Sequence, residues 1–157
     1  MKREQGFSLI ELLIVVAIIA IIAAIAVPSM LQARMAANES GAIQGCRTVG
    51  SAEVAYSAVN NQTYATVATM VTAGFVDSRF TNGFNGYTYA DAAVNSGAVA
   101  PTGFGVTATP GTAGTTGRYT YGINADQIVR WIAGTPTPMC GASACAANAP
   151  IGSGSGS

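Results

Sequence analysis

Apolar residues run almost without interruption from Phe7 to Val27 near the start of the chain. A helix of this length extends about 31 Å, which matches the hydrocarbon core of a membrane. Lys2 and Arg3 stand just before the run, so the positive-inside rule keeps the N-terminus in the cytoplasm and sends the rest of the chain outward. The run is longer than the core of a cleavable secretory signal and contains Glu11, so we expect a retained membrane-spanning helix.

A different pattern follows Pro28, because apolar residues now recur every three or four positions, as on one face of an amphipathic helix. Joined to the apolar run, this pattern predicts one helix over residues 7–59, about 80 Å long. Its first half needs lipid or other copies of the chain to cover it. The face expected to pack on a sheet comprises Met35, Ala42, Ile43, Cys46, Val49, Ala52, Tyr56 and Val59, while Arg34, Asn38, Arg47 and Ser51 lie elsewhere, solvated or in contact with other subunits.

The second half of the chain has a sheet-forming composition. Of the 19 glycines, only Gly6 precedes residue 41, and 11 fall between Gly103 and the end. Asn60 and Asn61 end the long helix, and Thr66 is expected to cap a short helix that ends before Gly74. Alternating large residues then predict an antiparallel meander packed on the helix, an α+β fold. The expected strands contain Tyr87 and Tyr89; Phe104, Val106 and Ala108; Tyr119, Tyr121 and Ile123; and residues 127–132.

The composition excludes several classes of function. Charged residues make up 9% of the 157 residues, seven basic against seven acidic, and histidine is absent. Without a basic cluster the chain lacks the groups that bind nucleic acid, which we do not expect as a main partner. Without an imidazole it lacks the usual general base and the commonest zinc ligand. We therefore expect no enzyme, no catalytic residue, no metal and no cofactor.

Glu11 is the single acid within the apolar run. An ionised carboxylate in a spanning helix costs about 2.5 to 3.5 kcal/mol near the membrane centre, so its presence calls for a partner. Lys2 and Arg3 reach toward it in the simplest interpretation. Alternatively, a cut after Gly6 gives Phe7 a new α-ammonium four residues before Glu11, and the same pair forms between neighbouring subunits.

The segment from Gly6 to Val16, GFSLIELLIVV, resembles the processing site of type IV prepilins. The resemblance implies that a prepilin peptidase cuts between Gly6 and Phe7 and methylates the amine of Phe7. It also implies that Glu11 is needed for filament assembly. Pro28 at the end of the apolar run, and the long helix before a Gly-rich sheet domain, fit the type IVa layout of the type IV pilin fold.

The resemblance implies a precursor in the inner membrane and an extracellular pilus after assembly, a helical filament of identical subunits. An assembly platform in the inner membrane and a separate ATPase would drive polymerisation, since the chain has no phosphate-binding loop of its own. We expect five segments: a leader (1–6), an apolar filament-core helix (7–28), its amphipathic continuation (29–59), a sheet domain (60–151) and a flexible Gly/Ser tail (152–157).

Three alternatives to a major pilin remain open. A minor pilin carries the same signals. The major pseudopilin of a type II secretion system typically has a Pro-Lys-Asp-Pro-Trp-Gly stretch and calcium-binding acids late in the chain, whereas Trp131 here stands without that context. A membrane-tethered receptor or adhesin that never polymerises leaves Glu11 unexplained.

The three cysteines predict one disulfide. Cys140 and Cys145 are close in sequence in a part expected outside the cytoplasm, so we expect them to close a small loop. Cys46 is expected as a small buried residue on the helix, or else as the partner of one of the other two. Zinc is poorly supported because a tetrahedral site needs four ligands.

Overall fold

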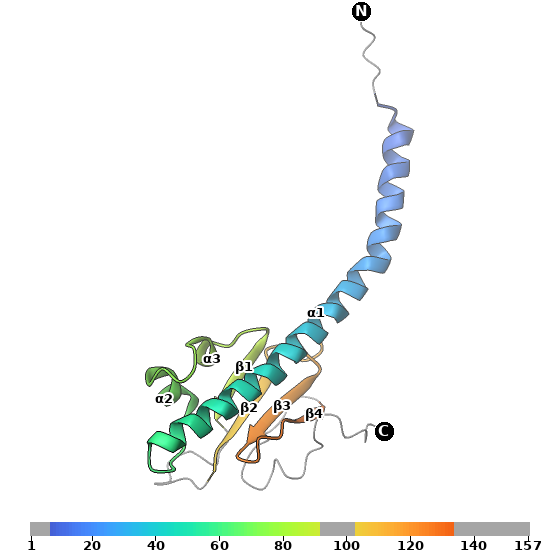
Figure 1. The fold of residues 1–157 in the computed structure, drawn as a ribbon. Helices are drawn as coiled ribbons and strands as arrows, with labels where there is room; N and C mark the ends of the chain where they lie inside the picture. The colour runs from blue at the N-terminus through green and yellow to red at the C-terminus, as the bar shows by residue number, and fades with distance from the viewer. Residues whose placement is uncertain (1–6, 92–102, 134–157) are drawn as a thin grey trace, which may run out of the picture. The chain divides into compact units, whose positions relative to one another are not determined.

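The computed structural model describes residues 7–91 and 103–133. The chain divides into two compact units, Met1–Arg34 and Met35–Ser157, which are considered separately. Helix α1 spans Leu9–Val59 and contributes to both units (Figure 1). The long helix predicted from the apolar run and the amphipathic pattern is therefore confirmed.

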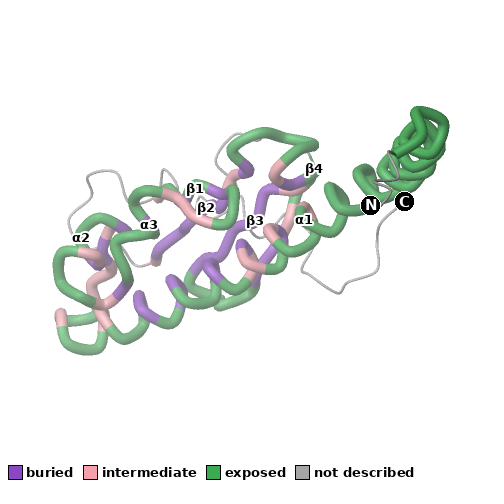
Figure 2. Tube along the Cα trace, turned by 90° about the horizontal axis from the view of Figure 1, so that it is seen from above, coloured by how far each residue is buried: buried purple, intermediate pink, exposed green. Residues whose placement is uncertain are grey.

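In the first unit α1 is apolar on every side. Its residues are exposed all round (Figure 2). Pro28 lies inside the helix, which continues through it. Because proline has no backbone N–H, it cannot donate to the carbonyl of Ala24, and one helical hydrogen bond is missing at this point.

In the second unit, the part of α1 from Met35 onward packs on an antiparallel sheet. The described residues form four strands in the order β1-β2-β3-β4, a simple meander as predicted. Two short helices, α2 and α3, lie beside each other and next to β1 (Figure 1). The elements are α2 Val67–Thr72, α3 Arg79–Asn82, β1 Tyr87–Asp91, β2 Gly105–Pro110, β3 Tyr119–Asn124 and β4 Arg130–Ala133.

Local residue chemistry sets where these elements begin and end. After α1, Asn61 and Gln62 adopt positive φ angles of 51° and 59°, which stop the helix. The hydroxyl of Thr66 accepts a hydrogen bond from the amide of Thr69, so it caps α2 as predicted. The fourth strand begins later than expected, because Gln127 has a φ of 61° and cannot continue an extended chain.

The core lies between α1 and one face of the sheet. A row of facing residues crosses all four strands, from Tyr89 through Ala108 and Tyr121 to Trp131. Ala42, Cys46, Val49 and Ala52 of α1 are buried against this face, as the periodic pattern predicted. The same prediction is wrong for Val59, which is the last residue of the helix and is 71% exposed.

Two carboxylates also lie in this core. Glu39 and Glu53 are buried on α1, where the apolar pattern gave no indication of an acid. Each accepts a hydrogen bond from a backbone amide of another part of the unit. A buried polar group is tolerated when it is hydrogen-bonded in this way.

Candidate assembly site in the apolar helix

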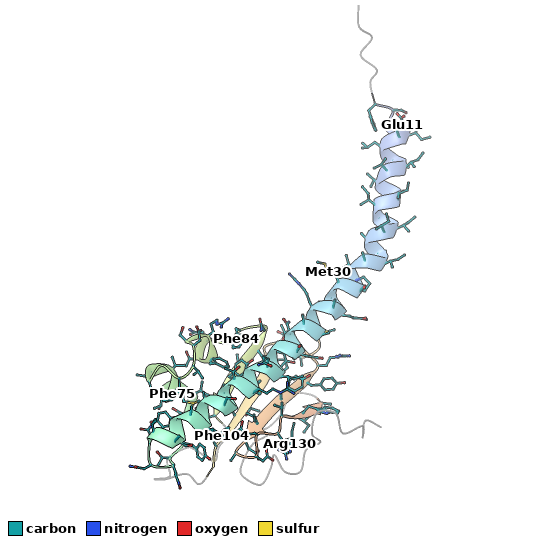
Figure 3. The ribbon with its side chains drawn as sticks, in the orientation of Figure 1. Glu11, Met30, Phe75, Phe84, Phe104 and Arg130 are labelled. Carbon is teal, nitrogen blue, oxygen red and sulfur yellow. The ribbon has the colours of Figure 1, made fainter. Side chains whose placement is uncertain are left out.

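The first half of α1 presents large apolar side chains in every direction (Figure 3). By length and composition the helix is able to cross a membrane. Transfer of one such side chain out of water is worth about 1.5 to 3 kcal/mol, so the segment is stable only where lipid or other protein covers it. The exposed residues are Phe7, Leu9, Ile10, Leu12, Leu13, Ile14, Val15, Val16, Ile18, Ile19, Ile21, Ile22, Ile25, Val27, Met30 and Leu31.

Glu11 lies in the first turn of this helix (Figure 3). Its Oε2 accepts a hydrogen bond from the backbone amide of Ser8 at 2.9 Å, and the carbonyl of Ser8 accepts one from the amide of Leu12 at 3.3 Å. Ser8 is therefore the N-cap residue and Glu11 the third helical residue, the spacing of a capping box. Within one chain the carboxylate already has a partner, which is a backbone amide.

The sequence carries this signal in Ser8-Leu-Ile-Glu11, and the expectation of a charged partner for Glu11 did not include it. The hydrogen bond matters for the proposed role of the acid. It holds the carboxylate at the N-terminal end of the helix, where the helix dipole favours negative charge. The backbone nitrogen of Phe7 is one residue from the amide that Glu11 binds, so an α-ammonium created there would be near the carboxylate.

The other predicted site residues are placed as follows. Phe7 is 76% exposed just before the helix, and Pro28 lies within it. Gly6 lies outside the described residues, as do Cys140 and Cys145, so the structure describes only the Phe7 side of the predicted cleavage site. Lys2 and Arg3, the alternative partners of Glu11, also lie outside them.

Cys46 is a free and fully buried thiol. Burial raises its pKa to about 12, although a backbone hydrogen bond with Ala108 acts in the opposite direction. At neutral pH the thiol therefore stays protonated, and it serves as a small core side chain. Its expected place on the side of the helix that faces the sheet is confirmed.

The described residues contain no group of three or more His, Cys, Asp or Glu side chains that could hold a metal ion. Their ion pairs each join one arginine to one carboxylate.

Comparison with protein families matches residues 1–27 to the prokaryotic N-terminal methylation motif. Comparisons with curated proteins and with solved structures give no match. The match covers Gly6, Phe7 and Glu11, the residues on which the sequence resemblance depends. It also fits the apolar helix of a membrane-anchored precursor. The first 27 residues thus match a type IV pilin-like prepilin signal, and this signal supports a precursor of the pilin or pseudopilin kind.

Proposed function

We propose that the chain is a structural subunit that polymerises into a type IV pilus after its leader is removed. The observation that carries the proposal is the combination of a prepilin methylation motif with a helix that is apolar on all sides. A methylated helix of this kind serves as a membrane anchor first and as the core of a filament afterwards. No chemistry is required of the subunit, only packing.

The cut would fall between Gly6 and Phe7, and methylation would follow on the amine of Phe7. Removal of residues 1–6 takes away Lys2, Arg3 and Glu4, so the mature subunit keeps five basic and six acidic side chains. Such a subunit is nearly neutral, and copies can pack closely without strong mutual repulsion.

In the assembled filament, Glu11 would exchange its partner. Within one chain its carboxylate binds the uncharged amide of Ser8. After the cut, the α-ammonium of Phe7 in a neighbouring subunit would offer a charged donor in an apolar surrounding, where an ion pair is stronger than in water. This pair would fix the axial position of one subunit against the next.

The remaining segments have structural roles in this proposal. Residues 7–28 would form the filament core, with the missing hydrogen bond at Pro28 as a point where the helix can adjust. Residues 29–59 and 60–151 would form the outer domain, with a disulfide between Cys140 and Cys145 and a Gly/Ser tail from 152. The chain would be processed by a prepilin peptidase and assembled by an inner-membrane platform with a separate ATPase. The assembled pilus would be extracellular.

The direct test is to shear cells that express the chain and to measure the mass of the subunit in the released fibres. The expected subunit lacks residues 1–6 and carries one additional methyl group on Phe7. Recovery of the chain only as an uncut membrane protein would contradict the proposal and favour a tethered receptor.

A pseudopilin is the second candidate, because the methylation motif supports both kinds of precursor. The same shearing experiment separates them. A pilus subunit is released in surface fibres, whereas a pseudopilin is cut and methylated but stays with the cell envelope.

A further inference from the structure

The carboxylate of Glu53 is buried without a charged partner. The residue has no exposed surface and lies near the C-terminal end of α1. Its Oε2 accepts a hydrogen bond from the backbone amide of Ala65 at 3.1 Å, while its Oε1 has no hydrogen-bond partner in the structure. A buried ionised oxygen without a partner is costly, so the surroundings favour the uncharged acid.

A second carboxylate binds the same stretch of chain. Asp91 ends β1 and is half-buried, and its Oδ1 accepts a hydrogen bond from the amide of Val67 at 2.9 Å. Glu53 and Asp91 thereby bind alternate amides of the segment that leads into α2. We call the two acids and the amides of Ala65 and Val67 the carboxylate clasp.

Among the described residues, no cation neutralises the carboxylates of the clasp. Asp91 is the charged side chain that acts on Glu53, and it repels. The tyrosines of the neighbouring elements point to aromatic partners, Tyr56 to Phe75 and Tyr64 to Phe104. Residues 92–102, outside the described part, carry no charged side chain in the sequence. The paired arginines bind other acids: Arg79 binds Asp77, Arg118 binds Glu39, and Arg130 binds Asp126.

We propose that the carboxylate clasp is a proton-controlled fastening of the segment that leads into α2 onto α1 and β1, which is tight when Glu53 carries a proton and loosens when it is ionised. The proton goes to the unpartnered Oε1, and Oε2 then accepts the amide of Ala65 as a neutral carbonyl oxygen. Ionisation puts a negative charge into the apolar core beside Asp91. The device involves only residues of the second unit, Met35–Ser157, so its test does not depend on filament assembly.

The direction of the pH effect follows from the pKa of Glu53. Burial, and to a lesser extent repulsion by Asp91, raise this pKa from 4.5 to about 7 against the opposing hydrogen bond from Ala65. Burial raises the pKa of Asp91 as well. The folded clasp therefore binds protons more tightly than the unfolded chain. Its stabilising effect is complete below pH 4.5 and is lost as the pH rises through about 7.

The test is hydrogen exchange of the full chain in detergent micelles, followed by mass spectrometry of peptides that cover residues 60–72. After correction for intrinsic exchange rates, we expect protection of this segment to fall at least about tenfold between pH 5.5 and 8.5, since one unit of pKa corresponds to a factor of ten. In Glu53→Gln the amide oxygen still accepts from Ala65 but cannot ionise, so protection should be independent of pH.

Two further variants make the test specific. Asp91→Asn keeps an acceptor for Val67 but removes the repelling charge, so the midpoint of the change should move to lower pH. Glu39→Gln alters a buried acid that is paired with an arginine, and residues 60–72 should keep the wild-type profile. A flat profile in the wild type, a wild-type slope in Glu53→Gln, or an unmoved midpoint in Asp91→Asn would each overturn the proposal.

Discussion

Glu39 of α1 binds Arg118, the residue before β3, through both of its carboxylate oxygens. Oε1 accepts from the backbone amide at 2.8 Å and from Nε at 3.2 Å, and Oε2 accepts from Nη2 at 3.2 Å. The Glu39 side chain is nearly buried, at 9% exposure, whereas that of Arg118 is more than half exposed, at 56%. The contact fastens the long helix to the sheet through three hydrogen bonds to a single carboxylate.

Glu39→Ala should therefore destabilise the domain by about 1 to 3 kcal/mol, because the amide of Arg118 loses a hydrogen bond to a charged and nearly buried acceptor. Glu39→Gln should cost less, since one oxygen remains. Arg118→Ala should have the smallest effect, because Glu39 keeps the backbone hydrogen bond and the guanidinium is already solvated. Thermal unfolding of the full chain in detergent, followed by circular dichroism, would check this order. A variant Glu39→Ala as stable as the wild type would exclude the contact as a fastening.

Gly45 and Tyr89 form a second close contact between α1 and the sheet. A Cβ atom at Gly45 would overlap the hydroxyl of Tyr89, whose ring is fixed between Phe80 and Phe84 at centroid distances of 5.0 and 5.1 Å. Gly45→Ala should therefore destabilise the domain by about 1 to 3 kcal/mol, although alanine is the better helix former. The measurement is the same thermal unfolding.

The control for this prediction is Tyr89→Phe. Its hydroxyl is buried and has no hydrogen-bond partner in the structure, so its removal should cost little or even stabilise. The double variant Gly45→Ala with Tyr89→Phe should regain only part of the stability lost in Gly45→Ala, because the hydroxyl is gone but the ring carbons Cζ and Cε1 would still lie 2.7 and 2.8 Å from the new Cβ. Additive effects of the two changes would show that the overlap is not the cause.

Cys46 should resist alkylation in the folded protein. Its thiol is fully buried and has a pKa of about 12, so both access and the thiolate fraction are low at pH 8. Treatment with iodoacetamide and mass spectrometry should find Cys46 unmodified in the native chain and modified after denaturation. Rapid modification before denaturation would contradict the packing of α1 on the sheet.

The parts of the fold that follow from a local pattern were predictable. The strands around Tyr87, Val106 and Tyr121 follow from alternation, and the cap at Thr66 follows from its neighbours. Helix α3 was not predicted, since four residues carry no periodicity. Glu39 and Glu53 look like solvent-facing acids in sequence because their partners are 79 and 12 residues away.

The candidate site divides in the same way. The apolar run and the motif around Gly6 and Phe7 are continuous in sequence, so both were found from the sequence alone. The hydrogen bond from Ser8 to Glu11 is also local, but an acid within a membrane segment predicts a charged partner, whereas the structure has a neutral capping interaction. Contacts between subunits depend on other copies of the chain and remain predictions.

Gly6→Leu should leave the full-length precursor in the membrane. Under the proposed processing, leucine would place a bulky side chain directly before the bond to be cut, while the apolar helix from Leu9 onward is unchanged. The subunit mass from a membrane fraction should then include residues 1–6, and fibres should be absent from the sheared fraction. The control is a precursor substituted at Val27, at the far end of the apolar run, and this precursor should still be cut. Normal processing of Gly6→Leu would remove this residue from the proposed cleavage site.

Glu11 carries two roles that a pair of substitutions separates. Glutamine still accepts a hydrogen bond from the amide of Ser8, so Glu11→Gln keeps the helix cap, whereas Glu11→Ala loses it. Neither variant carries the charge that the ammonium of Phe7 requires in a neighbouring subunit. If charge pairing drives assembly, both variants should be cut and methylated normally, and both should yield at least about tenfold fewer sheared fibres, the equivalent of about 1.4 kcal/mol per contact. Normal fibres from Glu11→Gln together with few from Glu11→Ala would instead assign Glu11 to the cap, because only the hydrogen bond to Ser8 distinguishes the two.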